Sequence, residues 1–190
     1  LTALQTYPKL VLDWRRDTAR LNVVQEQIDI GVRIGHLADS RLIARKIGET
    51  CEKIVMAPDL LRRLGKPKDF ADLQKNYPLA AVLNHNNGRA DTWYINENLQ
   101  FTPAKPHFVG SHIHNALQAA LAGNAVSQQL DWMVAPYLLN GELVELFAEV
   151  PKIRWPVSIY RPQRVVTPMR VKVVFDLLAE ILGKRFELPV

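Results

Sequence analysis

The pattern of apolar and polar positions alternates short apolar runs with stretches of helical spacing along most of the chain. Short runs rich in Val, Ile and Leu are typical of buried strands, whereas apolar residues at i, i+3, i+4 and i+7 indicate amphipathic helices. This alternation predicts an α/β fold with a largely parallel sheet. Strand-like runs occur at residues 9–14, 28–34, 42–56, 79–83, 92–95, 107–109, 125–130, 143–147 and 157–160.

Two helices are especially clear. In the first, Ser111 is the expected N-cap and Gly123 closes the helix, and five apolar residues at spacings 0, 3, 4, 7 and 8 from Ile113 share one face. The second is expected after Thr167-Pro168, with its end at Gly183. Shorter helical patterns cover residues 21–27, 58–64 and 131–139.

A turn-rich segment follows the strand-like run at residues 79–83. It contains Asn87-Gly88, and Asn-Gly between apolar runs favours a hairpin. We expect residues 92–95 to form the partner strand of this hairpin.

The composition is that of an ordinary globular domain, with 48% apolar and 23% charged residues. Lys and Arg number 24 and Asp and Glu 19, so the net charge is 24 − 19 = +5. Because the basic residues form no cluster, a mildly basic soluble domain is favoured over a nucleic-acid reader. No apolar run approaches the roughly 18 residues of a membrane span, and no signal-peptide pattern is present.

Cysteine usage points to a reducing compartment. Cys51 is the single cysteine, so no disulfide can form within the chain, and we expect a cytoplasmic protein with a buried thiol. The chain starts at Leu1 without Met, which leads us to expect that it begins inside a longer protein.

The sequence contains no motif that indicates catalysis. Gly-x-Ser-x-Gly, the phosphate-binding loop and Gly-x-Gly-x-x-Gly are all absent, and the carboxylates have no spacing typical of an acid/base pair. His112 and His114 would lie about 200° apart on a helix, which disfavours a shared metal ion. We therefore expect no enzyme activity, no catalytic residues, no metal and no cofactor.

Two loops at strand ends have the character of ligand sites. Arg33-Ile34-Gly35 ends a strand, where glycine allows close backbone approach and Arg can clamp a carboxylate. Gly110-Ser111-His112 opens a helix, whose free N–H groups favour anions. The alternatives are a solvated or structurally paired Arg33 and a Ser111 that serves only as a helix cap.

Four segments resemble the effector-binding domain of LysR-type transcription regulators. The stretch EQIDIGVRIGHLADSRLIARKIG at residues 26–48 is similar to the hallmark segment of that family. Segments at residues 55–73 (beginning VMAPDLL), 115–143 (beginning NALQAALAG) and 156–182 (beginning PVSIY) follow in the family's order. The resemblance covers nearly the whole chain.

This resemblance implies two Rossmann-like lobes of the periplasmic-binding-protein type II kind. Lobe I would hold residues 1–76 and 155–190, and lobe II, inserted between them, residues 77–154. A small organic effector would bind in the cleft between the lobes and control transcription. DNA would be contacted only through an N-terminal winged helix-turn-helix outside this chain. The resemblance also implies self-association, as a dimer and, at full length, a tetramer, in which residues 21–27 of one chain face the 111–122 helix of another. No membrane partner is implied.

The expected effector is a small organic anion, a carboxylate. The residues expected to bind it are Thr18, Arg33, Ile34 and Gly35 from lobe I and Asn84, His85, Gly110, Ser111 and His112 from lobe II. The chain departs from the family at residues 127–129, where Ser-Gln-Gln replaces an apolar run, and the family's first strand would precede Leu1. A free-standing solute-binding protein of the same fold is the alternative.

Overall fold

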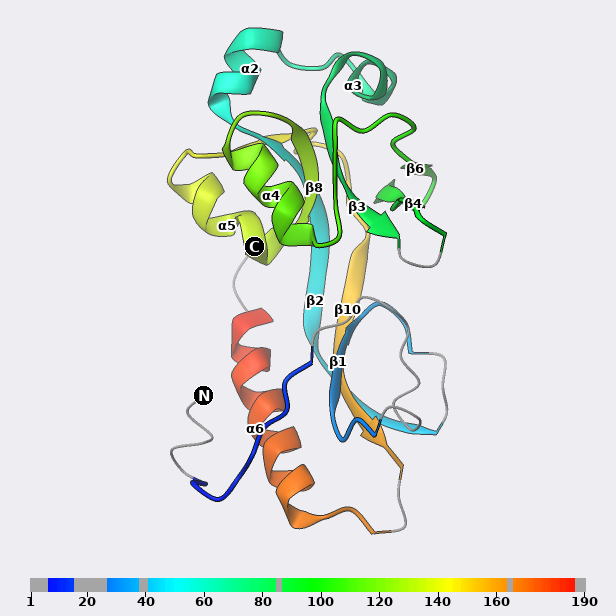
Figure 1. Cartoon of the computed structure of the whole chain (residues 1–190), viewed down its shortest axis with the longest axis vertical. Coiled ribbons are helices and arrows are strands. Elements are labelled where there is room, and N and C mark those ends of the chain that lie inside the picture. The colour runs from blue at the N-terminus through cyan, green and yellow to red at the C-terminus, as the bar shows by residue number, and fades with distance from the viewer. Residues whose placement is uncertain (1–6, 16–26, 38–40, 85–86, 164–165, 187–190) are drawn as a thin grey trace. The chain divides into compact units, whose positions relative to one another are not determined.

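The computed structural model describes residues 7–15, 27–37, 41–84, 87–163 and 166–186 (Figure 1). Helices and strands alternate only in part, because residues 79–110 hold five strands in succession. The expectation of a largely parallel sheet is wrong, since most pairings among the described strands are antiparallel. The elements, in chain order, are β1 (Gly31–Ile34), β2 (Leu42–Met56), α2 (Pro58–Leu64), α3 (Phe70–Asn76), β3 (Leu79–Asn84), β4 (Arg89–Ala90), β5 (Trp93–Asn96), β6 (Leu99–Phe101), β7 (Phe108–Gly110), α4 (Ile113–Leu121), β8 (Val126–Leu130), α5 (Asp131–Leu139), β9 (Val144–Leu146), β10 (Arg154–Pro162) and α6 (Met169–Phe186).

The chain divides into two compact units. Unit 1 consists of residues 1–50 and 155–190, and unit 2 of residues 51–154. The long strand β2 contributes its first part to unit 1 and its last part to unit 2. Residues 51–76, which were expected in lobe I, group with unit 2. The lobe boundaries stay a prediction.

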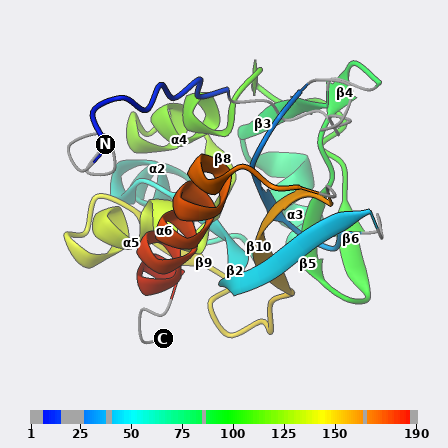
Figure 2. The same cartoon turned by 90° about the horizontal axis from the view of Figure 1, so that it is seen from below.

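Unit 1 is a sheet with one helix on its face. Strand β1 pairs with β10 antiparallel, and β10 neighbours β2. Figure 2 shows α6 along this sheet, where its apolar side packs on the strands. The buried residues of this contact are Ile47, Val157, Ile159, Phe175 and Ala179.

Two expectations for unit 1 are wrong. Residues 9–14 form no strand: no described strand pairs with them, and Val11 and Trp14 are 91% and 74% exposed. Helix α6 continues past Gly183 to Phe186, which packs against the unit 1 core beside Gly48. That packing outweighs the helix-breaking tendency of glycine.

Unit 2 is a mixed sheet covered on both faces. Strand β8 pairs antiparallel with β2 and parallel with β3, which in turn pairs parallel with β7. Figure 1 shows α4 and α5 on one side of β8 and α3 and β6 on the other. Since side chains alternate along a strand, Ile54 and Met56 join the apolar cluster with α3, whereas Val55 joins the cluster with α4 and α5.

The hairpin after β3 differs from the expectation. Its partner strand is β4, with Asn84 opposite Arg89, and β5 instead pairs with β6. Trp93 and Phe101 lie in the same apolar cluster with ring centroids 5.3 Å apart, which explains why β5 and β6 pair. The helix at residues 58–64 is confirmed, with Pro58 in its first turn. None of the described helices combines the length and apolar character that a membrane span needs.

Candidate functional site

The turn between β7 and α4 brings strand ends and a helix start together in unit 2. Gly110, the last residue of β7, lies beside Val82 of the parallel strand β3. Gly110 is buried, and a Cβ there would lie 2.5 Å from the Cβ of Asn115. Glycine at this position therefore lets the chain turn tightly into the helix.

The N-cap of α4 is His112, and the expected Ser111 cap is wrong. His112 has an extended backbone (φ −141°, ψ 139°), and its carbonyl accepts the Asn115 N–H at 2.9 Å. No side chain caps the helix, and its first turn holds no acidic residue. The His112 side chain therefore does not cap the first N–H groups of α4, and the positive end of the helix dipole at this turn favours a negatively charged partner.

Asn84 ends β3 near this turn, but its side chain is used locally. Its Nδ2 donates to Asp91 Oδ1 at 2.7 Å, and its backbone oxygen accepts the Gly88 N–H at 2.8 Å. Asn84 thus organises the loop between β3 and β4. His85 lies outside the described residues.

The expected residues of unit 1 lie at the end of β1. Gly35 has φ +97°, which glycine adopts without strain, and its N–H donates to the Pro156 oxygen at 2.8 Å. Ile34 pairs with Val157 of the buried face, so Arg33, opposite Ser158, points to the other face of the sheet. Arg33 is half-buried, and Thr18 lies outside the described residues.

A buried amide beneath α4 was not among the expected site residues. Gln129 on β8 has no exposed surface, and its Nε2 donates to the Ile113 backbone oxygen at 3.3 Å. The polar run at residues 127–129 was the sequence signal for this feature. Its burial could not be read from the sequence, because it depends on α4 packing over β8.

Cys51 is buried, as expected, and pairs with a carboxylate. Its thiol donates to Asp131 Oδ2, with 3.4 Å between the heavy atoms. Burial, followed by the negative charge of Asp131, raises the pKa of the Cys51 thiol to about 11. The thiol therefore stays protonated at neutral pH and is a poor nucleophile.

A second polar cluster joins three charged side chains. Glu145 receives one 2.8 Å bond from Lys53 and another from Lys152. Burial acts to raise the pKa of Glu145, but the two lysines outweigh it and hold the pKa below its ordinary value. Every carboxylate oxygen has a partner, so the cluster is best explained as structural.

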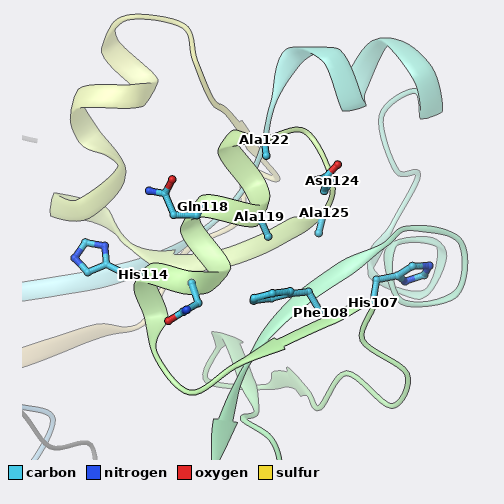
Figure 3. Close-up of a pocket in the computed structure, with 9 residues that line it drawn as sticks. His107, Phe108, His114, Gln118, Ala119, Ala122, Asn124 and Ala125 are labelled. Carbon is cyan, nitrogen blue, oxygen red and sulfur yellow. The ribbon is translucent and has the colours of Figure 1, made fainter.

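A cavity of about 660 Å³ lies along α4 on the side of β7 (Figure 3). Phe108 points from β7 toward the helix, and His107 points away from it. Alanines and Phe108 line its apolar part, and polar side chains stand around them. The lining residues are His107, Phe108, His114, Asn115, Gln118, Ala119, Ala122, Asn124 and Ala125. Among the residues that the structure describes, no group of three or more His, Cys, Asp or Glu side chains could hold a metal ion.

Comparison with known proteins identifies a family. The model described as the LysR substrate binding domain matches residues 2–183. The HTH-type transcriptional regulator CrgA of Neisseria meningitidis (serogroup C, strain 8013) is 26% identical over 183 residues, which are 94% of this chain and 60% of CrgA. An HTH-type transcriptional regulator of Xanthomonas campestris is 25% identical over 182 residues, 93% of this chain and 52% of that protein. The chain thus spans between half and two thirds of these relatives.

Solved structures agree with the expected fold class. The regulatory domain of CrgA from Neisseria meningitidis has a TM-score of 0.79 at 23% identity, covering 96% of this chain and 89% of that one. The effector domain of AmpR from Pseudomonas aeruginosa has a TM-score of 0.67 at 19% identity, covering 96% and 88%. The prediction of an α/β fold of the periplasmic-binding-protein type II kind is confirmed.

Proposed function

The chain belongs to the LysR substrate-binding domain family, and on that premise we propose that it is the effector-sensing part of a transcription regulator. Its relatives carry the name HTH-type transcriptional regulator, and the chain spans about 60% of CrgA. DNA contact comes from a helix-turn-helix segment of the full-length protein outside residues 1–190. Because a transcription regulator acts on DNA, we propose a cytoplasmic location.

The effector is a small organic anion bound at the start of α4. The observation that supports this most is the uncapped first turn of α4 behind the tight turn at Gly110. The N–H groups at the start of the helix and the helix dipole stabilise negative charge there. Ser111 adds a hydroxyl next to the same turn, and His112 adds an imidazole ring.

Unit 1 contributes to the same effector through Arg33, Ile34 and Gly35. This part of the proposal rests on family membership and on the chemistry of Arg33, whose guanidinium can bind a carboxylate through two hydrogen bonds. Thr18 and His85 complete the proposed set. Asn84 acts by holding the β3–β4 loop, since its amide already bonds Asp91.

Calorimetric titration with a panel of carboxylic acids and their neutral amides tests this function. We expect an acid to bind more tightly than its amide, and both Ser111→Ala and Arg33→Gln to weaken it about tenfold or more. Arg62→Gln, the same charge change on the exposed face of α2, is the matched control and leaves the affinity unchanged. Tighter binding of a neutral amide, unaffected by Ser111→Ala, would mean that the anion site is wrong.

The chain also associates with itself, as a dimer in isolation and a tetramer at full length. The support within unit 2 is the cavity along α4, whose apolar lining is exposed in a single chain. The partner segment expected from the sequence, residues 21–27, falls largely outside the described residues. Light scattering of the wild type should give the mass of a dimer. Ala122→Glu, at the rim of the cavity, should give the mass of a monomer. Ala135→Glu, exposed on α5, is the control that stays dimeric.

A further inference from the structure

Gln129 lies against the first turn of the helix that starts the proposed effector site. It is fully buried near the end of β8, and its Nε2 donates to the Ile113 backbone oxygen and to Ser127 Oγ, both at 3.3 Å. Ile113 is the first residue of α4. The amide of Gln129 and the uncapped N–H groups therefore belong to the same end of one helix.

These two bonds determine which way the amide faces. Turning it by half a rotation would place Oε1 against the Ile113 carbonyl oxygen, so that two acceptors would face each other. Oε1 is thus directed away from that carbonyl, and it accepts no hydrogen bond from any residue that the structure describes. A buried acceptor without a donor destabilises the fold, and an apolar side chain at this position would avoid that cost. A buried acceptor that has no donor among the described residues therefore indicates a donor on a bound partner.

The two groups at the start of α4 need partners of opposite kind. The N–H groups of the first turn, apart from that of Asn115, take an acceptor, and Oε1 of Gln129 takes a donor. Building on the proposed function, we propose that the effector is a small acid with a hydroxyl or amino group next to its carboxylate, and that Oε1 accepts a hydrogen bond from that group. Both protein groups lie at one helix end, so the ligand is a 2-hydroxy or 2-amino acid rather than a long chain.

Binding of such a ligand requires a local movement. The surface of Oε1 is closed in this structure, so the donor reaches it only if the first turn of α4 moves away from β8. Hydrogen exchange of the amides in residues 113–117 should therefore change when the hydroxy acid binds. A deoxy acid, which has no donor for Oε1, should leave that exchange closer to that of the ligand-free chain.

Matched pairs of acids test the role of Gln129. Calorimetry compares lactate with propionate, malate with succinate, and 3-phenyllactate with 3-phenylpropionate. We expect the hydroxy acid of at least one pair to bind the wild type about tenfold more tightly than its deoxy partner. Gln129→Leu should abolish this preference and leave the affinity for the deoxy acid unchanged. Gln128→Leu is the control: this buried neighbour donates to the Tyr94 oxygen instead, so the preference should survive.

Separate outcomes distinguish the two proposals. If acids bind but the hydroxyl group brings no preference, or if the preference survives Gln129→Leu, the role of Gln129 is wrong and the anion site stands. If no acid of the panel binds the wild type, the anion site is wrong and the inference fails with it. The melting temperature of Gln129→Leu checks that the variant folds, because the substitution removes the unpaired acceptor and also the donor to Ser127 Oγ. If leucine does not fit, Gln129→Met, whose side chain is unbranched and of similar length, is used in place of Gln129→Leu.

Discussion

Cys51 donates its thiol hydrogen to the carboxylate of Asp131, across 80 positions of the sequence and with 3.4 Å between Sγ and Oδ2. The pair joins β2 to the start of α5 within unit 2. A buried thiol beside a carboxylate stays protonated, because ionisation would place two negative charges together. The bond therefore exists only while the thiol keeps its proton.

The first prediction concerns the reactivity of this thiol. With a pKa of about 11, roughly one thiol in a thousand is ionised at pH 8. We expect 5,5′-dithiobis(2-nitrobenzoate) to label the folded chain at pH 8 at least tenfold more slowly than the urea-unfolded chain. Asp131→Asn removes the neighbouring charge and should speed labelling of the folded chain. Equal rates for folded and unfolded wild type would contradict the assigned environment.

The second prediction concerns alkaline stability. The ordinary pKa of the thiol is 9.0, and folding raises it to about 11. The folded state thus holds the proton more tightly, so the stabilisation is complete below pH 9 and decreases as the pH rises through 11. Urea unfolding of wild type and Cys51→Ala should show a stability difference that is smaller at pH 10.5 than at pH 8. A difference independent of pH would be the contrary result.

How much of the fold the sequence predicts depends on whether the signal is local. The helix at residues 58–64 is marked by Pro58 and Gly65 within its own length, and the structure has the same bounds. Residues 9–14 have an apolar strand pattern, yet they form no strand because a strand also needs a neighbour to pair with. That neighbour is not specified by the run itself.

The candidate site, like the fold, is predicted only where its signal lies in neighbouring residues. The helix start after Gly110 is predicted from local residues, although the cap lies at His112 instead of Ser111. Gln129 is missed, because three residues cannot show that β2 and β8 pair with Lys53 opposite Gln129 and that α4 covers the amide. Only the unusual polarity of residues 127–129 in a strand-like run is visible in advance.

The third prediction concerns the ion cluster of Glu145. Glu145→Gln leaves Lys53 and Lys152 near each other without a carboxylate and should lower the free energy of unfolding by about 2 kcal/mol at pH 7. The pKa of Glu145 is lowered from 4.5, so its contribution is present above pH 4.5 and is lost as the pH falls through the folded-state value. Urea unfolding at pH 7 and pH 3.5 measures both effects. Glu149→Gln, exposed and close in sequence, is the control that should change little.

The fourth prediction compares two leucines. Leu117 on α4 is 2% exposed in the cluster with Val55 and Val134, whereas Leu139 at the end of α5 is 91% exposed. Leu117→Ala should lower the free energy of unfolding by about 2–5 kcal/mol, through lost burial and the cavity left behind. Leu139→Ala should stay within about 0.5 kcal/mol of the wild type. Similar losses for both variants would place the core of unit 2 elsewhere.

The last prediction concerns the tight turn at Gly110. A methyl group at this position would lie 2.5 Å from the Cβ of Asn115, and neither atom can move without moving the backbone of β7 or α4. Gly110→Ala should therefore lower the free energy of unfolding by about 1–3 kcal/mol, and the shift of α4 should also weaken binding of the preferred acid. Adding Asn115→Gly removes the opposing Cβ and should restore part of the affinity relative to Gly110→Ala alone. Adding Asn115→Ala keeps that Cβ and should restore nothing, which separates the steric effect from the loss of the asparagine amide. If both double variants bind alike, the contact between residues 110 and 115 does not set the position of α4.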